Sequence, residues 1–561
     1  MTGEQRAILI AVFVAAVVVL MFVERFRAVK RWRAYLRSLW GKLPDRSYEE
    51  GDITRIAGRF RRSQEAAPFA VDDITAADLD LDEIFRRLNY CRTSVGEEVL
   101  YETLRTPSFD ARELEKRRRL ADECLADRET TLKMQERLAG IGKSRRLSVS
   151  DCLETLMTAS RPGIAVHIAC IAAILVSAAC FFFLPGQAVV LFVLAITVSL
   201  MLYYREKGKV APLYLCMQYI ARTVRVSGKL TAIPVNGERE ALFAEIRRQC
   251  DRLASIRRFA GVLRSTEMIG GNPLEVVWDY VAMIFHADLL CFALLMQTLR
   301  KERAAAEHLL TDIGLLETAI STALWRASTD HVCVPELTDD QAAYLQAEGL
   351  RHPLLEKAVP NTIDTGRPVL LTGSNASGKS TFLKTAAVNA ILAQTIGFVR
   401  ADAYKAPFAR VMSSMALKDS LVGGESYFMV ELRSLKRILD AQGPGVLFAF
   451  VDEVLRGTNT VERIAASSHI LSVLADAGVL VFAATHDGEL TSLLEGQYDN
   501  YHFEETIEDG DVRFSYELKK GPATSRNAIE LLRVFGYGEE IVERSRAAAA
   551  AFEETGVWRM T

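Results

Sequence analysis

This sequence of 561 residues is poor in paired cysteines, in net charge and in repetition. It has nine cysteines, an odd number, with no C-x-x-C pair and none beyond Cys333. That pattern argues against a disulfide framework and against a zinc site, and it predicts buried free thiols in a reducing compartment. The net charge is only -3, so the chain has no global basic field for nucleic acid, and a DNA-binding surface would have to be a local patch.

Charged side chains are also missing from an apolar run near the start, residues 7–23, which is close to the lower length limit for crossing a bilayer. A cleaved signal peptide is the alternative, but such a peptide carries its charge before the apolar run. Here the basic residues follow the run, so we predict an anchor over residues 1–30 with its N-terminus outside and its flank in the cytoplasm. These residues could instead contact nucleic acid: Arg25, Arg27, Lys30, Arg31, Arg33 and Arg37.

A second apolar block covers residues 163–204, and Pro185-Gly186-Gln187 divides it into spans at 163–184 and 188–204. We predict a transmembrane helical hairpin, because about 40 nearly uncharged residues exceed what a soluble core usually hides. A buried hairpin in a soluble core is the alternative. Both flanks are basic and are therefore expected inside. His167 is the one ionisable residue within the spans, and its place near an end predicts an interfacial position.

Helical patterns surround the hairpin. We predict a juxtamembrane linker over residues 31–72 and an all-α core in two parts, 73–162 and 205–349. A single helix is expected at 82–104, ended by Pro107, and a core helix at 289–299.

From residue 350 to 561 the pattern changes to strands that alternate with helices, which predicts an α/β domain with a mostly parallel sheet. Strands are expected at 369–371, 446–451 and 479–484. A hairpin with Asp-Gly turn chemistry is expected between 501–506 and 512–518. Helices at 525–534 and 539–552 close the chain.

One stretch of the α/β domain fits the phosphate-loop pattern G-x-x-x-x-G-K-[ST]. It lies between the strand at 369–371 and a helix expected at 382–392, which is the context that the motif needs. Lys379 would reach the β- and γ-phosphates and Ser380 would hold Mg²⁺, so the expected cofactors are ATP and Mg²⁺. The loop consists of Gly373, Ser374, Asn375, Ala376, Ser377, Gly378, Lys379, Ser380 and Thr381.

Two further strand ends carry chemistry. The strand at 446–451 ends in Asp452 and Glu453, which suit the Mg²⁺ shell and the attacking water, respectively. The strand at 479–484 leads to His486, which could hydrogen-bond the γ-phosphate or simply be a satisfied surface histidine. We therefore expect catalytic roles for Glu453, His486 and Lys379, with Ser380 and Asp452 on the metal.

A Ser–Gly loop at 419–426 precedes a helix expected at 427–439, and a helix N-terminus can bind an anion. ATPases of the ABC type place such a loop across a dimer interface. We therefore predict a homodimer in which Ser426 completes the partner's ATP site in trans.

Residues 351–551 resemble the ATPase domain of the MutS family of DNA mismatch-repair proteins. The resemblance implies nucleotide and Mg²⁺ roles for Asn375, Lys379 and Ser380, and a dimerising helix–turn–helix at 521–546. The matching pieces are Arg351-His352-Pro353, the phosphate loop, SYFMVEL at 426–432, VDEVLRGTNT at 451–460 and ATHDGEL at 484–490.

The resemblance weakens upstream. Residues 92–96, RTSVG, look like the start of the family's helical core, and the membrane hairpin occupies the region where that family carries a DNA clamp. The residues before Asp73 are too few for the family's mismatch-reading domain. Residues 359–363 hold no aromatic side chain, although the family usually stacks one on adenine upstream of the loop.

We therefore expect a membrane-anchored, MutS-related ATPase that acts as a dimer, coupled to DNA binding that selects structure and not mismatches. It would be a multi-pass protein of the cell membrane with its core and ATPase domains in the cytoplasm. The alternative is a mechanochemical membrane ATPase with no DNA partner. A transporter of ABC type is disfavoured, because the spans contain no charged side chain to mark a substrate route.

Overall fold

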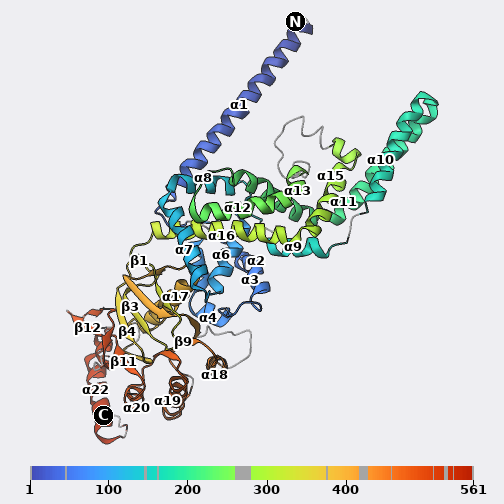
Figure 1. Ribbon diagram of the computed structural model, residues 1–561. Coiled ribbons are helices and arrows are strands. Elements are labelled where there is room, and N and C mark those ends of the chain that lie inside the picture. The colour runs from blue at the N-terminus through green and yellow to red at the C-terminus, as the bar shows by residue number, and fades with distance from the viewer. Residues whose placement is uncertain are drawn as a thin grey trace. The chain divides into compact units, whose positions relative to one another are not determined.

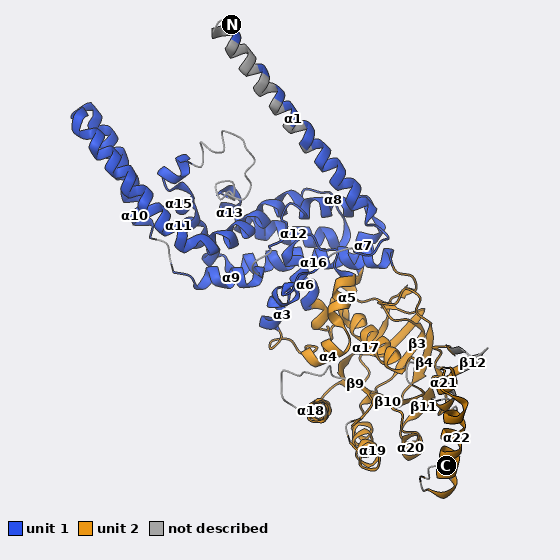
Figure 2. Ribbon diagram, turned by 180° about the vertical axis from the view of Figure 1, so that it is seen from behind, with its two compact units in different colours: residues 1–63, 88–102, 119–328 blue, residues 64–87, 103–118, 329–561 orange. Residues whose placement is uncertain are grey.

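The structure is a computed structural model in which the chain forms two compact units, each assembled from separate stretches of sequence (Figures 1 and 2). Unit 1 contains residues 1–63, 88–102 and 119–328, and unit 2 contains residues 64–87, 103–118 and 329–561. The residues that the structure describes are 3–44, 47–144, 148–160, 163–259, 280–374, 377–415, 427–456, 458–508, 511–523, 528–534, 536–556 and 558.

Among its described residues, unit 1 contains helices and no strands, as the sequence predicts for the core. Helices α6 (Ser94–Arg105) and α7 (Ala111–Ala126) each begin in one unit and end in the other. The other helices of unit 1 are α1 (Gly3–Ser38), α2 (Asp52–Ile56), α3 (Gly58–Ser63), α8 (Arg128–Leu138), α9 (Val149–Thr158), α10 (Ile164–Ala179), η1 (Cys180–Phe182), α11 (Pro185–Leu230), α12 (Gly237–Arg252), α13 (Ala254–Phe259), α15 (Ala287–Lys301) and α16 (Arg303–Ala327).

The prediction of one helix over 82–104 is wrong, because five residues separate the end of α5 (Leu81–Leu88) from the start of α6. A buried carboxylate from α16 interrupts the helical pattern. Glu317 accepts hydrogen bonds from the backbone N–H groups of Arg92 and Thr93, at 2.7 and 3.1 Å, and from the Thr93 hydroxyl at 2.6 Å. These donors lie at the N-terminus of α6, where backbone N–H groups lack helical partners. Glu317 therefore caps a new helix.

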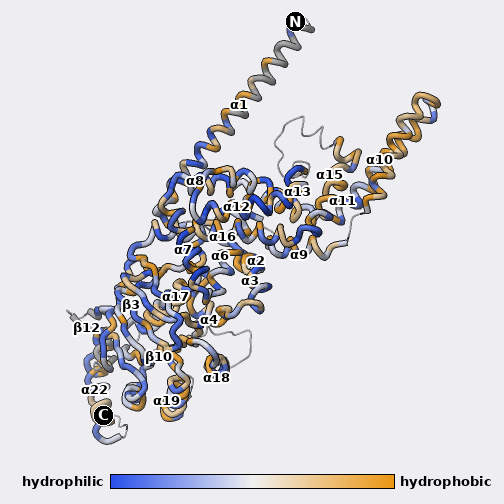
Figure 3. Tube along the Cα trace, viewed as in Figure 1, coloured by the Kyte–Doolittle hydropathy of each residue, from blue (hydrophilic) through white to orange (hydrophobic). Residues whose placement is uncertain are grey.

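The second apolar block forms two helices that pack on each other, α10 with η1 and the first part of α11. Figure 3 shows that both helices are apolar, and both are long and apolar enough to cross a membrane by length and composition. Only 17% of each apolar window is buried. Large side chains at the turn are exposed, with Phe182 at 89% and Phe183 at 83%. Helix α11 does not end at residue 204 but continues through Pro212 to Leu230.

His167 is not at an exposed interface, as the sequence suggested, but is buried at 2% exposure. Its Nδ1 lies 2.8 Å from Nδ1 of His286, whose Nε2 lies 2.9 Å from the Ser199 hydroxyl. One turn further along α11, Tyr203 donates to Asp288 at 2.9 Å. Polar contacts therefore join the hairpin to the start of α15, and α15 itself buries one face as the predicted core helix.

Helix α1 contains the first apolar run, but most side chains there lie outside the described residues, so the N-terminal span stays a prediction. Its C-terminal end packs on unit 1. Leu36 is buried, and Arg33 and Arg37 pair with Glu136 and Glu129 of α8 at 2.9 and 3.3 Å. Two of the arginines that follow the apolar run are thus engaged within the protein.

Unit 2 is built on a six-stranded sheet with the order β14-β11-β5-β10-β9-β8. All neighbouring pairs are parallel except β11 with the edge strand β14, which confirms the mostly parallel sheet. Its strands are β5 (Val369–Thr372), β8 (Ala409–Ser414), β9 (Val446–Asp452), β10 (Leu480–Ala484), β11 (Asp499–His502) and β14 (Lys519–Lys520). The helices of unit 2 are α4 (Asp73–Asp78), α5, α17 (Lys379–Thr395), α18 (Tyr427–Asp440), α19 (Thr460–Asp476), α20 (Glu489–Leu493), α21 (Ala528–Val534) and α22 (Glu539–Thr555).

Smaller sheets complete unit 2. The helical pattern predicted up to residue 349 is wrong, because strands begin at Val332. In β3 burial alternates from Leu345 to Glu348, a period of two that belongs to a strand. The strands involved are β1 (Val332–Cys333) with β6 (Val399–Arg400), and β2 (Glu336–Thr338), β7 (Ala403–Pro407), β3 (Leu345–Leu350) and β4 (Asn361–Thr365) in the order β2-β7-β3-β4.

The predicted hairpin is present but shorter than expected. Strands β12 (Glu505–Glu508) and β13 (Asp511–Phe514) pair antiparallel with Glu508 opposite Asp511. Residues 501 and 502 belong instead to β11 of the large sheet. The two residues at the tip of this turn lie outside the described residues.

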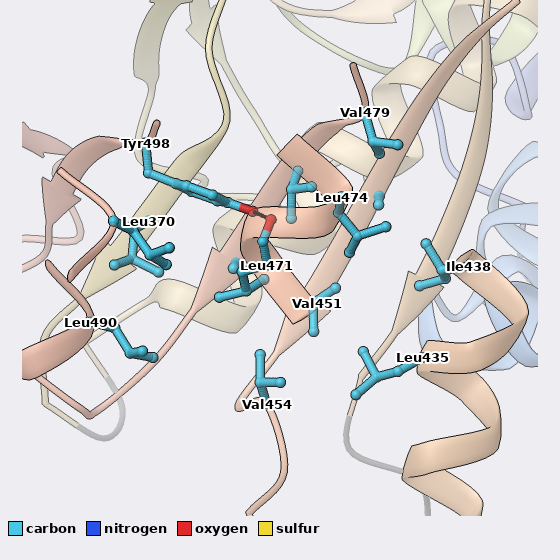
Figure 4. Packing of buried hydrophobic residues seen from close by; sticks show 14 of the residues in the cluster. Leu370, Leu435, Ile438, Val451, Val454, Leu471, Leu474, Val479, Leu490 and Tyr498 are labelled. Carbon is cyan, nitrogen blue, oxygen red and sulfur yellow. Dashed lines mark hydrogen bonds between the residues drawn. The ribbon is translucent and has the colours of Figure 1, made fainter. Parts of the chain in front are cut away.

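The core of unit 2 fills the space between the large sheet and its helices (Figure 4). Leu370 and Val451 point into it from the strands, and Leu471 and Leu474 from α19. Tyr498 is buried at 2% exposure, and its hydroxyl donates to the Leu471 carbonyl at 2.8 Å, so its polar atom is satisfied. This packing fixes the strands whose ends carry the candidate site.

Candidate nucleotide-binding site

Sheet register brings the predicted site residues together. Ala484, the last residue of β10, is level with Leu371 of β5 on one side and with Asp452 of β9 on the other. Because these strands are parallel, their carboxyl ends meet at one edge of the sheet. The phosphate loop follows β5, the acid pair lies at the end of β9 and His486 follows β10, so residues more than 100 positions apart converge.

Two glycines shape the phosphate loop. Gly373 has φ +141° and Gly378 has φ +116°, conformations that favour glycine. A Cβ at Gly373 would also approach the Phe503 carbonyl to 2.5 Å. Helix α17 begins directly after Gly378, so its free N–H groups face the loop. Asn375 and Ala376, which the sequence predicts to bind nucleotide, lie outside the described residues, as does Ser426.

Lys379 is buried beneath the loop. Its Nζ donates to the carbonyls of Gly373 and Ser374, at 2.7 and 2.8 Å. Burial lowers the pKa of Lys379 to about 8, against the opposing effect of nearby carboxylates, with that of Asp452 the largest. The ammonium group is thus held by the loop that it would have to leave for a phosphate.

Asp452 and Glu453 lie in different environments although they are adjacent. Burial raises the pKa of Asp452, and its carboxylate is hydrogen-bonded to Ser380. One carboxylate oxygen of Glu453 lies 2.8 Å from Nε2 of His486, and the other lies 2.9 Å from the Arg456 guanidinium. The hydrogen bond from His486 is the largest effect that lowers the pKa of Glu453. Glu453 is therefore kept ionised, as a group that orients water must be.

Two buried polar atoms in this cluster have no hydrogen-bond partner among the described residues, Ser377 Oγ and Asp452 Oδ1. Buried polar atoms are almost always satisfied, so such atoms need an explanation. A phosphate in the loop and a divalent cation beside Asp452 would supply the missing partners. Ser380 and Asp452 offer the oxygen ligands that Mg²⁺ prefers, so the residues present fit both ATP and Mg²⁺.

Sequence reasoning missed two residues beside the loop. Glu505, only 5% exposed, accepts a hydrogen bond from the Ser374 hydroxyl at 2.7 Å. The ring of Tyr516 lies 3.3 Å from the position that a Cβ of Gly378 would take, and it stacks on Phe514 at a centroid distance of 5.8 Å. An aromatic residue was sought upstream at 359–363, whereas the structure brings one from the segment after β13. The only sequence signal is the alternation of Phe514 and Tyr516.

Comparison with known proteins agrees with this geometry. Residues 369–553 match a protein-family model described as MutS domain V. The chain is 33% identical over 303 residues to a Haloarcula marismortui protein named DNA mismatch repair protein MutS 2, covering 48% of this chain and 31% of that protein. It is 37% identical over 213 residues to a protein of the same name from Halobacterium salinarum, covering 36% and 25%.

A third relative, from Thermus thermophilus and named DNA mismatch repair protein MutS, is 34% identical over 206 residues, which is 36% of this chain and 25% of that protein. The matches thus span a third or less of the length of these curated relatives. They confirm the expected similarity to the ATPase domain of MutS proteins. The apolar hairpin lies outside residues 369–553, so the family model says nothing of it.

Proposed function

We propose that this chain is a membrane-anchored ATPase of the MutS type that binds and hydrolyses ATP as a dimer and couples this cycle to DNA binding. One observation carries the ATPase part: three neighbouring strand ends place a glycine-shaped loop, an acid pair and a histidine at one sheet edge, with two buried polar atoms still unpartnered. An ATP–Mg²⁺ complex would give both atoms a partner.

In this proposal the loop N–H groups and the N-terminus of α17 bind the phosphates, and Lys379 leaves the Gly373 and Ser374 carbonyls to reach them. Ser380 and Asp452 would hold Mg²⁺, which would supply positive charge near the transferred phosphoryl group. Glu453 accepts a proton from the attacking water while His486 and Arg456 hold its carboxylate in place. Ser426 of a second copy completes each site in trans.

The proposed membrane attachment is supported by the exposed apolar surface of the hairpin. Only 17% of each apolar window is buried, whereas a core helix of a soluble protein is mostly buried. With basic residues at both flanks, the hairpin enters and leaves from the cytoplasmic side, which puts the ATPase domain in the cytoplasm. The N-terminal run adds a third span with its N-terminus outside.

The DNA arm of the proposal is supported by the relatives, whose names state DNA mismatch repair. The alternative is a mechanochemical membrane ATPase without DNA. One observation supports this alternative. Hydrogen bonds of His167, Ser199 and Tyr203 join the hairpin to the start of α15, so the hairpin is connected to the helical core by polar contacts.

The test is the ATPase rate of the full chain in detergent, with and without duplex, mismatched and branched DNA, across a salt series. Glu453→Gln should retain ATP binding but lose hydrolysis and trap the dimer, and Lys379→Ala should lose nucleotide binding. Hydrolysis at the normal rate by Glu453→Gln would refute the catalytic assignment. DNA stimulation that disappears as salt rises supports DNA coupling. A rate indifferent to DNA, with no DNA bound at low salt, supports the membrane alternative.

A further inference from the structure

Helix α11 carries a narrow solvent-facing stripe that is entirely basic apart from one glycine. Between Cys216 and Leu230 every residue is buried except Arg222, Arg225, Gly228 and Lys229. These positions are three and four residues apart, so they fall on one face of the helix. Every side chain that α11 offers to solvent in this stretch is therefore a cation.

Gly228 lets a fourth cation join this stripe. A Cβ at Gly228 would lie 3.6 Å from Cδ and 3.8 Å from Nη1 of Arg257, which comes from α13. Arg257 thus lies over the glycine that precedes Lys229 in the sequence. We call Arg222, Arg225, Lys229 and Arg257 the basic stripe.

The basic stripe is not neutralised by carboxylates. Among the described residues, no carboxylate pairs with Arg222, Arg225 or Lys229 at 4.0 Å or less. Arg257 does pair with Asp251, at 3.9 Å. Some exposed arginines elsewhere in unit 1 are paired, for example Arg248 with Glu245 at 3.1 Å and Arg303 with Glu307 at 2.7 Å. Like charges at these helical spacings repel one another and destabilise the helix, so the stripe suits an external anion.

The spacing of the stripe fits a chain of phosphates. From Arg222 to Lys229 the helix rises about 10 Å, which covers about three phosphates of one DNA strand at 3.4 Å of axis each. A lipid surface fits less well. The apolar part of α11 ends near Tyr204, so Arg222 lies about 27 Å further along the helix, several times the screening length of about 8 Å at physiological salt.

We propose that the basic stripe is a nucleic-acid contact surface of this protein, which binds the phosphate backbone without reading sequence. This inference rests on the DNA arm of the proposed function and locates it on the helical core, outside the ATPase domain. The chain's net charge of -3 gives no global attraction to nucleic acid, so a contact surface has to be a local cluster of cations such as this stripe.

The experiment measures fluorescence anisotropy of labelled duplex and branched DNA with the full chain, from 50 to 300 mM salt. The test variant is Arg222→Gln with Arg225→Gln and Lys229→Gln. The matched control is Arg248→Gln with Arg303→Gln, which removes cations that are already paired. Since each lost phosphate contact removes about 0.9 from the slope of log affinity against log salt, the test variant should lose about 2 to 3. Its affinity at 50 mM salt should fall at least tenfold.

The outcomes separate the stripe from the wider proposal. If the wild-type protein binds no DNA at 50 mM salt, the DNA arm fails together with the stripe. If the wild type binds and the test variant keeps both slope and affinity, the stripe assignment is wrong and the DNA arm survives. Both variants are also placed in nanodiscs of phosphatidylserine and of phosphatidylcholine. If the test variant differs from the wild type in ATPase rate only in phosphatidylserine nanodiscs, and its affinity for DNA is unchanged, the stripe contacts lipid and the proposal is wrong.

Discussion

The carboxylate of Glu317 fills the space that a side chain at residue 96 would need. A Cβ on Gly96 would lie 2.8 Å from Cδ and 2.9 Å from Cβ of Glu317. Glu317 cannot easily withdraw, because it is buried and accepts three hydrogen bonds from Arg92 and Thr93. These contacts explain two residues of the segment RTSVG: Thr93 donates hydrogen bonds to the carboxylate, and Gly96 leaves space for it.

Gly96→Ala should destabilise the protein by about 2 to 4 kcal/mol, because the methyl group either overpacks the site or displaces a buried carboxylate from its donors. Alanine is otherwise the better helix former, so the sign of the effect is diagnostic. The measurement is urea denaturation of the full chain in detergent. Gly208→Ala on α11 is the control, since nothing lies within 4 Å of its Cβ position, and it should be neutral or stabilising. Equal stability of both variants would contradict the packing argument.

The convergence of the candidate site residues could be predicted from the sequence because its signals are local. The strand before the phosphate loop, the acid pair of Asp452 and Glu453, and His486 each form a short pattern in which an apolar strand precedes polar residues. The parallel sheet then brings the strand ends together, a step that the alternation of strands and helices already implies. The structure adds the register, in which Ala484 is level with both neighbouring strand ends.

What the sequence could not predict depends on distant partners. The break between α5 and α6 is caused by Glu317, more than 220 residues away from the donors that it caps. Tyr516 reaches the phosphate loop only because a hairpin returns the chain to Gly378. Strands β1 to β3 were predicted as helix because these short strands pair with residues that follow them by 11 to 69 positions, and a local pattern does not contain that pairing.

ATP affinity should depend on pH through Lys379. Its pKa of about 8 means that the ammonium group begins to lose its proton just above neutral pH. Because the neutral amine attracts phosphate poorly, the Kd for ATP should rise as pH increases through 8, by up to about tenfold between pH 7 and pH 9. Fluorescence titration with a labelled ATP analogue at constant Mg²⁺ measures this. Lys379→Arg stays charged and should bind with a flat pH profile. A flat profile for the wild type would mean that Lys379 of the free protein stays protonated through pH 9, which contradicts a lowered pKa.

Tyr516 should contribute to nucleotide affinity by stacking on the base. Replacement by Asn suits its φ of +55° and removes the ring, so the Kd for ATP should rise about twofold to tenfold, the range expected for one aromatic stack. Tyr516→Phe keeps the ring and should bind normally. Tyr537→Asn, another exposed tyrosine of unit 2, controls for general surface effects. If Tyr516→Asn binds ATP as tightly as Tyr516→Phe, the ring does not contact the base.

Stability in acid should report on the histidine pair. His286 and His167 meet through their Nδ1 atoms at 2.8 Å, so one of these nitrogens donates a hydrogen bond and the other accepts it. The neutral pair can therefore gain one proton, but a second would place two N–H groups opposite each other. Burial lowers the pKa of His286, and the neighbouring His167 adds to this effect. The charged groups that face the pair are Asp288, Lys207 and Glu206.

Because the folded state lowers the pKa of His286 below its unfolded value, the unfolded chain binds more protons, and this contribution to stability is lost as pH falls below about 6.5. His286→Asn tolerates the residue's φ of +49° but cannot titrate. It should lower the melting temperature at pH 7.5, where the histidine contact is intact, and the gap to wild type should narrow towards pH 5.5. Thermal unfolding of both proteins in one detergent, measured across this range, tests the difference, in which carboxylates common to both proteins cancel. A gap that stays constant with pH would mean that the pair does not gain protons on unfolding.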